Sequence, residues 1–540
     1  MRMSRRDLLR TVAAAPALIA GGCCTRSYPR AASLAPTPRS RGFFAVPAAT
    51  RTAARTYPVI DVHAHFFNGS DVPVRGFVGD CLGHAAGPAQ PLFKLLALLA
   101  ERIADAAPTA VDELHRLDEL ESLPGMTAAT IRDKAEAERS AAAQRTADVV
   151  RNSAFEREYL RMTTRGQRAA RAGGTHLQAH DVMRAVDAGE RPSRAPAAVA
   201  AAASQADVAD GLLAFLYYMV SYRWVNLDSY RRVFTLGEDA FGFDATLGAL
   251  VDFDYWLDCA PPSTHDDQVR LHQRLYEMHA PRTRDSNQRP YFYPVVAYNP
   301  WTDITQDGAA LKRLVDACTR GNFVAAKIYP PIGFRPAGNA ASDEGTRKRR
   351  PDRQKLDATL KRFFDTCAER RIPVLAHTSR SNGRDSVHDE FGGPDGWSRL
   401  LIQYAAAPNT PILDFGHFGG SAWTTTFAAL IGGNPKMALY GDLGYWDELM
   451  CAPADSEACV GSRARLKAAL RVPIGESGET VLDRTMFATD WLMLSQVKRW
   501  AEYPERLHDS LRAVLDGTGA DEGVARIFGG NALNCFRLDR

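Results

Sequence analysis

A short run of β-branched and aromatic residues reads VIDVHAHFF, from Val59 to Phe67. Side chains on a strand alternate between its two faces, so His63 and His65 are expected on the same face. The Asn-Gly pair at 68–69 then breaks the run. The run therefore predicts a short strand that carries two imidazoles near its end.

From about residue 245 onward, short apolar runs alternate with longer helix-like stretches. The predicted strands lie at 246–257, 291–298, 323–329, 373–378, 412–417, 437–443 and 485–490. The predicted helices lie at 266–279, 308–320, 353–370, 397–406, 423–430, 462–470 and 497–515. With the first run this makes eight strands that alternate with helices, which is typical of an eight-fold β/α barrel. The predicted fold is an α/β TIM barrel built from residues 57–69 and 245–540.

The segment 70–244 has a different composition from the rest of the chain, being rich in Ala, Arg and Glu. These residue types favour helix. Tyr217, Tyr218 and Trp224 indicate the core of such a helical region rather than a substrate platform. We expect a large, mainly helical insertion after the first strand. Because active sites of barrels form at the loops that follow the strands, the insertion is expected to overhang the site.

The N-terminal segment has the features of an export signal. Arg5-Arg6 precede a short apolar run, which is followed by Ala-Gly-Gly and then Cys23. This order resembles a twin-arginine signal peptide over 1–23 in which Cys23 is lipidated, and an ordinary cleavage nearby is the alternative. Residues 24–56 are rich in Pro, Ala and Arg and predict a disordered tether. We expect export to the periplasm or cell envelope, with any membrane attachment made through the lipid.

The composition excludes several classes of protein. A chain of 540 residues with 45% hydrophobic and 24% charged residues is neither wholly disordered nor a polytopic membrane protein. The net charge is only +3, and residues 1–22 carry four Arg against one Asp, which argues against nucleic-acid binding. The nine cysteines are too sparse for a disulfide scaffold, and their spacing leaves a Cys451–Cys459 pairing open. The expected partner is a small-molecule substrate, and a homo-oligomer is left open.

Polar side chains stand at the ends of several predicted strands. His63 and His65 end the first, His377 the fifth, His417 the sixth and Asp490 the eighth. The carboxyl ends of barrel strands meet at one mouth, so these side chains are expected to converge. Imidazoles with one carboxylate suit Zn²⁺, with Mn²⁺ as an alternative. Such an ion lowers the pKa of a bound water toward neutrality, and Asp490 is the expected base that takes its proton.

These elements resemble the amidohydrolase superfamily, and within it the amidohydrolase-related family that includes aminocarboxymuconate-semialdehyde decarboxylase-like proteins. The matching stretches are DVHAH at 61–65, AHT at 376–378, FGH at 415–417, FATDW at 487–491 and IFGGNAL at 527–533. The resemblance covers residues 57–69 and 245–538. It implies that His63, His65, His377 and Asp490 bind a metal. It also implies that His417 acts on the substrate or its oxyanion, or binds a second metal.

Three further side chains are candidates at the same mouth. Lys327 lies among apolar residues of the fourth strand, where a charge needs a partner. We expect Lys327 to contact an anionic substrate group beside a single ion; in some superfamily members a strand-four lysine is carboxylated and bridges two ions. Arg335, after the same strand, is a candidate ligand for a carboxylate, with a surface role as the alternative. Asp442 ends the seventh strand and is a candidate partner of a histidine or a helix cap.

Three other histidines, His265, His272 and His279, repeat every seven residues along one predicted helix. This spacing is too wide for a single metal ion, and it predicts an exposed stripe.

The sequence as a whole predicts an exported metal-dependent hydrolase, in which activated water attacks a C–N or C–O bond of a small molecule. One alternative is a metal-dependent, non-oxidative decarboxylase of an aromatic or unsaturated acid. Another is a catalytically silent binding protein of the cell envelope. A serine hydrolase is disfavoured because the sequence lacks a GxSxG motif.

Overall fold

The structure is a computed structural model of the chain. It describes residues 56–76, 95, 98–123, 128–163, 176–190, 205–236, 240–255, 257, 260–281, 289–341, 353–381, 386–450, 457–497, 499–516 and 519–538. The chain divides into Met1–Ser33 and Leu34–Arg540, and all described residues belong to the second unit. The predicted signal peptide, Cys23, Cys451 and the tether up to residue 55 lie outside the described residues.

Eight parallel strands follow one another around a sheet in sequence order. They are β1 (Ile60–Ala64), β2 (Ala245–Ala249), β3 (Phe292–Ala297), β4 (Ala325–Ile328), β5 (Val374–His377), β6 (Leu413–Gly416), β7 (Leu439–Asp442) and β8 (Thr485–Met486). The segment after β8 pairs back with β1, since the His65 amide donates to the Trp491 carbonyl at 2.7 Å. Ala64 and Trp491 form a parallel bridge at the same place. The predicted TIM barrel is thereby confirmed.

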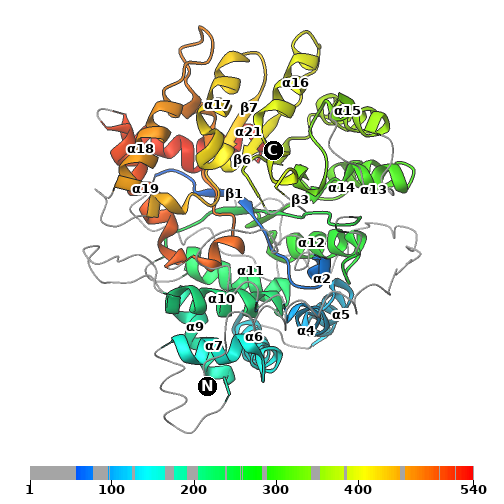
Figure 1. Cartoon of the computed structure of the whole chain (residues 1–540), viewed down its shortest axis with the longest axis vertical. Coiled ribbons are helices and arrows are strands. Elements are labelled where there is room, and N and C mark those ends of the chain that lie inside the picture. The colour runs from blue at the N-terminus through cyan, green and yellow to red at the C-terminus, as the bar shows by residue number, and fades with distance from the viewer. Residues whose placement is uncertain are drawn as a thin grey trace, which may run out of the picture. The chain divides into compact units, whose positions relative to one another are not determined.

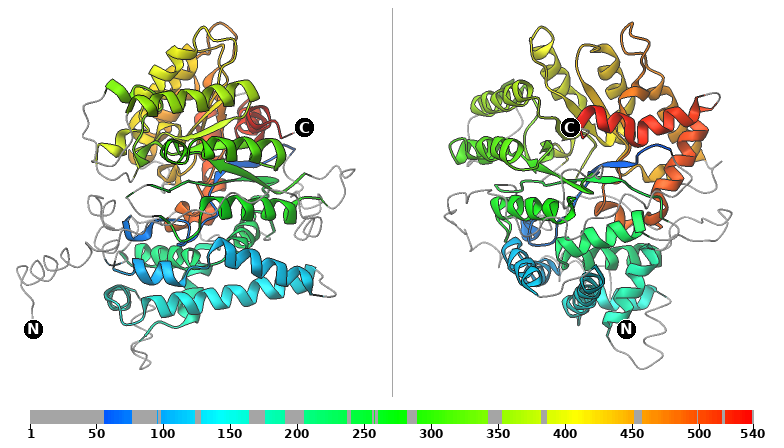
Figure 2. Two further views of the ribbon diagram at one scale, coloured as in Figure 1. Left: turned by 90° about the vertical axis from the view of Figure 1, so that its right-hand side faces the viewer. Right: turned by 180° about the vertical axis from the view of Figure 1, so that it is seen from behind.

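Nine helical elements lie between β1 and β2. They are α2 (Val74–Gly76), α4 (Ala100–Ala106), α5 (Ala110–Ser122), α6 (Ala128–Val150), α7 (Ala154–Met162), α9 (Ala179–Glu190), α10 (Gln205–Met219), α11 (Arg223–Arg231) and η4 (Arg232–Leu236), counting those that the structure describes. Figures 1 and 2 show α4 to α11 gathered on one side of the sheet. Tyr217, Tyr218 and Trp224 are at most 1% exposed, so their predicted place in the core is confirmed.

The remaining helices follow the later strands. They are α12 (His265–His279), α13 (Pro300–Thr305), α14 (Ala309–Arg320), η6 (Pro330–Ile332), η7 (Asn339–Ala341), α15 (Arg353–Arg370), η8 (His388–Glu390), α16 (Pro394–Tyr404), η9 (His417–Gly419), α17 (Gly420–Gly433), η10 (Asp447–Met450), α18 (Glu457–Leu470), η11 (Val481–Arg484), η12 (Met493–Gln496), η13 (Trp500–Glu502), α19 (Tyr503–Leu515), α20 (Ala520–Ala525), η14 (Arg526–Gly530) and α21 (Asn531–Phe536). Among the described residues, no helix is both long and apolar enough to cross a bilayer.

The interior of the barrel is filled by one apolar cluster. Val62, Leu247, Val295 and Leu375 belong to it, as does Phe536 of α21. Such strands are buried on both faces, which explains why they read as continuous apolar runs. The tail also packs closely at the start of β1, because a Cβ at position 529 would lie 2.1 Å from the carbonyl oxygen of residue 58. The tail motif therefore helps to close the barrel where its strands begin.

The strand predicted at 246–257 is shorter in the structure and ends at Ala249. The chain then turns, because the Asn299 side-chain amide donates to the carbonyls of Asp252 and Asp254 at 3.2 and 2.8 Å. The Asp254 amide also donates to the Asp252 carboxylate at 2.9 Å. These local hydrogen bonds compete with the sheet and stop it early.

The predicted exposed stripe on α12 is wrong. His265, His272 and His279 are 1%, 1% and 3% exposed. The helix is covered on two sides, since it packs against both β3 and α5. Burial lowers the pKa of His272 to about 4, so its imidazole is neutral, and its Nε2 lies 3.2 Å from the Phe66 carbonyl. The sequence pattern does not show that α5 covers this helix.

Candidate metal centre

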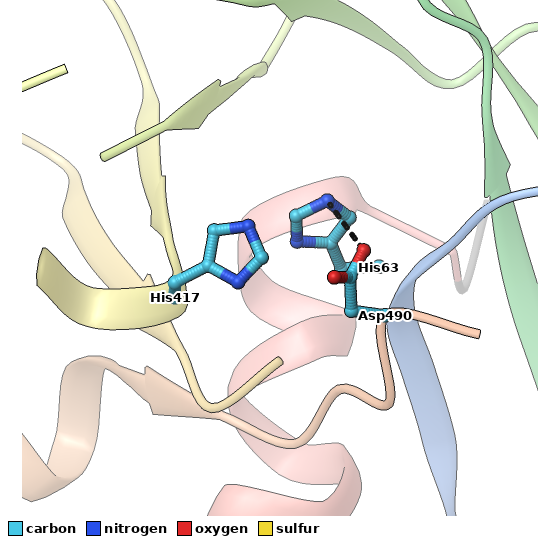
Figure 3. Close-up of side chains that lie close together, drawn as sticks. All are labelled: His63, His417 and Asp490. Carbon is cyan, nitrogen blue, oxygen red and sulfur yellow. Dashed lines mark ion pairs between the residues drawn. The ribbon is translucent and has the colours of Figure 1, made fainter. Parts of the chain in front are cut away.

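Three side chains from different parts of the barrel meet at its mouth. His63 comes from β1, His417 opens η9 directly after β6, and Asp490 follows β8. Each offers one ligand atom, and these atoms lie within 4.8 Å of one another. Figure 3 shows the two imidazole rings facing each other, with the Asp490 carboxylate beside His63. All three residues are buried, so the group is shielded from bulk water.

The two other predicted ligands adjoin this group. His65 Nε2 lies 3.2 Å from His63 Nε2 and 3.3 Å from Asp490 Oδ1. His377 Nδ1 lies 3.0 Å from His417 Nε2. The structure thus brings the five side chains together, while it is His417 rather than His377 whose ligand atom groups with those of His63 and Asp490. The individual ligand roles stay predictions.

Three imidazoles have their Nδ1 atoms turned toward oxygen acceptors. His63 Nδ1 faces Asp442 Oδ2 at 3.0 Å, His65 Nδ1 the Ala249 carbonyl at 2.7 Å, and His417 Nδ1 the carbonyl of residue 444 at 2.9 Å. A carbonyl or carboxylate accepts only, so each Nδ1 carries the proton. The Nε2 atoms of His63, His65 and His417 are left with lone pairs, as metal ligands require. Two such lone pairs 3.2 Å apart fit a cation held between them.

Burial and charge keep two imidazoles of this group, those of His63 and His377, neutral. The pKa of His63 lies well below its ordinary value because of burial, and the positive charge of Lys327 lowers it further. Burial also lowers the pKa of His377, assisted by His417 and Lys327. Neutral imidazole is the form that binds a metal. The electrostatics of the pocket therefore agree with the hydrogen bonds.

Asp442, at the end of β7, orients two of the histidines. Its Oδ1 accepts hydrogen bonds from the backbone amides of His417 and Gly444, each at 2.9 Å. Its Oδ2 accepts the Nδ1 proton of His63. The contact with a histidine that the sequence predicts for Asp442 is therefore present. The Asp442 carboxylate, at the end of β7, is thus hydrogen-bonded both to His63 of β1 and to His417 directly after β6.

Asp490 is anionic and strained in its backbone. It adopts a φ of +53°, and its amide donates to the His63 carbonyl at 2.7 Å. Burial raises the pKa of this carboxyl, but its interactions with His65, His417 and His63 outweigh burial and lower it. An anionic carboxylate held beside imidazoles is suited to bind a cation or to accept a proton.

Asp61 holds the backbone of the two strands that carry ligands. Its Oδ1 accepts the amides of His63 and Thr489 at 3.1 and 3.0 Å. Its Oδ2 accepts the hydroxyls of Thr489 and Tyr230. Burial raises the pKa of Asp61 to about 7, and these hydrogen bonds oppose that rise. Tyr230 comes from α11, 169 residues away in sequence, and no motif marks it.

Lys327 lies on β4 with its Nζ 2.6 Å from His63 Nε2. Burial lowers the pKa of this amine to about 8, and the charges of Asp442, Asp490 and Asp414 oppose that shift. The amine therefore lies beside His63, and its contact with an anionic substrate group stays a prediction. The Arg335 guanidinium lies over the ring of Phe391, 4.6 Å from its centroid, and its role as a carboxylate ligand stays a prediction.

Comparisons with known proteins find similarity only among solved structures: no family model and no curated protein matches the chain. A TIM-barrel protein of uncharacterised function from Bordetella bronchiseptica is 16% identical, over 55% of this chain and 79% of its own, with a TM-score of 0.35. A protein described as a metal-dependent hydrolase from Lactobacillus casei is 12% identical, over 90% and 96%, with a TM-score of 0.38. An amidohydrolase from Burkholderia multivorans with bound Hepes is 12% identical, over 55% and 84%, with a TM-score of 0.32.

A second structure of a Burkholderia multivorans amidohydrolase, with bound zinc, is 14% identical, over 45% and 83%, with a TM-score of 0.25. These four solved structures are 12–16% identical to the chain. Their TM-scores are too low to carry an argument about chemistry, which rests on the geometry of this chain.

Proposed function

We propose that the protein is a metal-dependent hydrolase of the amidohydrolase type. The observation that carries this proposal is the arrangement of Nε2 lone pairs from His63, His65 and His417 beside the Asp490 carboxylate. One divalent ion, with Zn²⁺ favoured over Mn²⁺, suits this set of donors. A bound ion of this kind lowers the pKa of water and polarises a carbonyl or related group.

The side chains around the ion have separate roles in the proposed reaction. Asp490, anionic and buried, accepts the proton of the attacking water at Oδ1 and passes it to the leaving group. His63, His65 and His417 are held in one tautomer by their Nδ1 acceptors, so they need no reorganisation during the reaction. Lys327, whose pKa is about 8, presents its amine to an anionic group of the substrate. The substrate is a small molecule with a C–N or C–O bond to be cleaved.

The first experiment measures bound metal and hydrolysis together. We expect purified protein to hold about one Zn²⁺ per chain and to hydrolyse a member of a panel of esters, lactones and amides. A His63→Ala/His65→Ala variant should lose both properties. The matched control is His115→Ala/His180→Ala, which removes two exposed imidazoles from α5 and α9. Metal-free protein, or a His63→Ala/His65→Ala variant with full activity, would contradict the mechanism.

The products distinguish hydrolysis from its rivals. Incorporation of ¹⁸O from labelled water into the product supports hydrolysis. Release of CO₂ from an aromatic or unsaturated acid, without label entering the product, identifies a decarboxylase instead. Tight binding of a ligand with no turnover under any metal identifies a binding protein.

We also propose that the protein is exported by the twin-arginine route, with Cys23 as a lipid attachment site. Cys459 is disulfide-bonded, whereas Cys318, Cys367 and Cys535 are free, so the partner of Cys459 lies outside the described residues. Disulfides persist in oxidising compartments, which supports export. Replacing Arg5-Arg6 by two lysines should retain the protein in the cytoplasm, and Cys23→Ala should release it from the membrane fraction. Unchanged fractionation of both variants would contradict this proposal.

A further inference from the structure

The chain that follows β7 runs directly over the candidate metal centre. The carbonyl of Gly444 accepts the Nδ1 proton of His417, and its amide donates to Asp442. A Cβ added at Gly444 would lie 3.0 Å from Asp442 Oδ1, 3.4 Å from His63 Nδ1 and 3.5 Å from the Cβ of Asp490. The backbone of the next residue, Tyr445, therefore lies at the edge of the site.

Tyr445 has a strained backbone that its neighbours enforce. Its φ is +56°, a left-handed conformation that costs a bulky residue about 1–2 kcal/mol. On its other side, the Trp446 indole Nε1–H donates to the His417 carbonyl at 2.9 Å, and the Trp446 amide is bonded to the Tyr503 hydroxyl at 3.1 Å. Strain of this kind persists only where the surroundings fix it, and it concentrates at functional sites.

The Tyr445 hydroxyl differs from those of the other tyrosines at this end of the barrel. The hydroxyls of Tyr230, Tyr329 and Tyr503 are bonded to Asp61, Ser381 and the Leu443 carbonyl. For Tyr445, which is half-buried, the described part of the chain supplies no hydrogen-bond partner. A phenol whose ring is packed and whose hydroxyl is unpaired is a group available to a ligand.

The charge around Tyr445 keeps it a hydrogen-bond donor. Burial raises the pKa of its phenol, and the charges of Asp447 and Asp490 raise it further. The backbone next to Tyr445 lies beside the carboxylate that we propose as the base, since a Cβ on Gly444 would lie 3.5 Å from the Cβ of Asp490. A neutral phenol there donates without adding negative charge to the site.

We propose that the Tyr445 hydroxyl donates a hydrogen bond to the substrate oxygen on which negative charge gathers during hydrolysis. This inference rests on the proposed function and assigns to Tyr445 a role that no sequence motif marks. It makes the residue a specificity element as well, because the substrate must place an oxygen beside the phenol. No proton leaves Tyr445 in this role, so the step needs no further reactant.

The test uses methylphosphonate as a tetrahedral oxyanion probe and the full-length, zinc-loaded protein. Calorimetry should show that Tyr445→Phe binds methylphosphonate about 10- to 100-fold more weakly than the wild type, the effect of losing one hydrogen bond to a charged group. With a substrate from the hydrolysis panel, kcat should fall by a similar factor while KM changes little. The ring is retained in Tyr445→Phe, so thermal unfolding should be unchanged.

The matched control is Tyr404→Phe, because the Tyr404 hydroxyl donates to Asp365 between the outer helices α16 and α15. It should bind methylphosphonate like the wild type. Equal affinity in wild type and Tyr445→Phe, or no binding by the wild type, would overturn the role of Tyr445. The two proposals fail separately: a zinc-free or hydrolytically inactive wild type refutes the proposed function, whereas the phosphonate affinity ratio decides on Tyr445 alone.

Discussion

The Nδ1 of His63 lies 3.0 Å from Oδ2 of Asp442, and both side chains are fully buried. The other oxygen of Asp442 accepts hydrogen bonds from the amides of His417 and Gly444, so both oxygens of the carboxylate are fixed in position. It fixes the tautomer of His63 and the backbone of His417 at the same time. The candidate ligands on β1 and after β6 therefore depend on one side chain of β7.

Asp442→Asn should weaken zinc binding by about 10- to 100-fold, the usual effect of removing a partner of a metal-binding histidine. An amide offers one acceptor in place of two, so it cannot serve His63, His417 and Gly444 together. Competition with a chelator measures the affinity. Asp365→Asn, on the outer helix α15, is the control and should bind zinc like the wild type. An unchanged affinity in Asp442→Asn would show that Asp442 does not orient the site.

Lys327→Met should change how the stability of metal-free protein depends on pH. Burial lowers the Lys327 pKa from 10.5 to about 8, so between these values the unfolded chain binds a proton that the folded protein has released. Stability therefore rises with pH across this window. Relative to Lys327→Met, the wild type should gain about 2 kcal/mol in unfolding free energy between pH 7.5 and pH 10. Urea unfolding at several pH values measures this difference.

Lys361→Met is the matched control for this measurement. The Lys361 side chain is 60% exposed and pairs with Asp365 on the same helix, so no pH-dependent gain over the variant is expected in this window. A difference between wild type and Lys327→Met that stays constant from pH 7.5 to pH 10 would mean that Lys327 keeps an ordinary pKa in the folded protein.

The polar residues at the carboxyl ends of the strands were the part of the site that the sequence predicts best. His63, His377, His417 and Asp490 could be placed at one mouth because barrel strands are short apolar runs whose carboxyl ends meet. The backbone acceptors of the site could not be predicted. Every residue has a backbone carbonyl, so nothing in the sequence marks those of Ala249 and Gly444 as partners of His65 and His417. Burial of α12 was missed for a similar reason: it depends on where α5 packs, not on the sequence of α12 itself.

Tyr230→Phe tests how far the helices between β1 and β2 support the site. It removes one donor from the fully buried Asp61 carboxyl, which should cost about 1–3 kcal/mol of unfolding free energy. Zinc affinity should fall as well, because Asp61 holds the amide of His63. Tyr404→Phe is the control, since Lys361 still hydrogen-bonds Asp365 there. If Tyr230→Phe unfolds like the wild type and keeps its zinc affinity, α11 does not support the metal centre.

Arg223→Met tests the buried ion pairs that join α11 to Asp71, in the segment after β1, and to Glu113 of α5. The Arg223 guanidinium is fully buried between the carboxylates of Asp71 and Glu113. Removing it leaves two buried carboxylates without their cation, which should cost about 3–5 kcal/mol of unfolding free energy. The control is Arg116→Met, whose side chain is 33% exposed and whose loss should cost about 1 kcal/mol or less.

Neutralising the two carboxylates separates charge from packing. A triple variant that adds Asp71→Asn and Glu113→Gln to Arg223→Met should recover part of the lost stability, because its buried amides carry no charge to desolvate. Urea unfolding of the single and triple variants measures the recovery. If the triple variant is no more stable than Arg223→Met alone, the loss comes from packing around the guanidinium rather than from the uncompensated charges of Asp71 and Glu113.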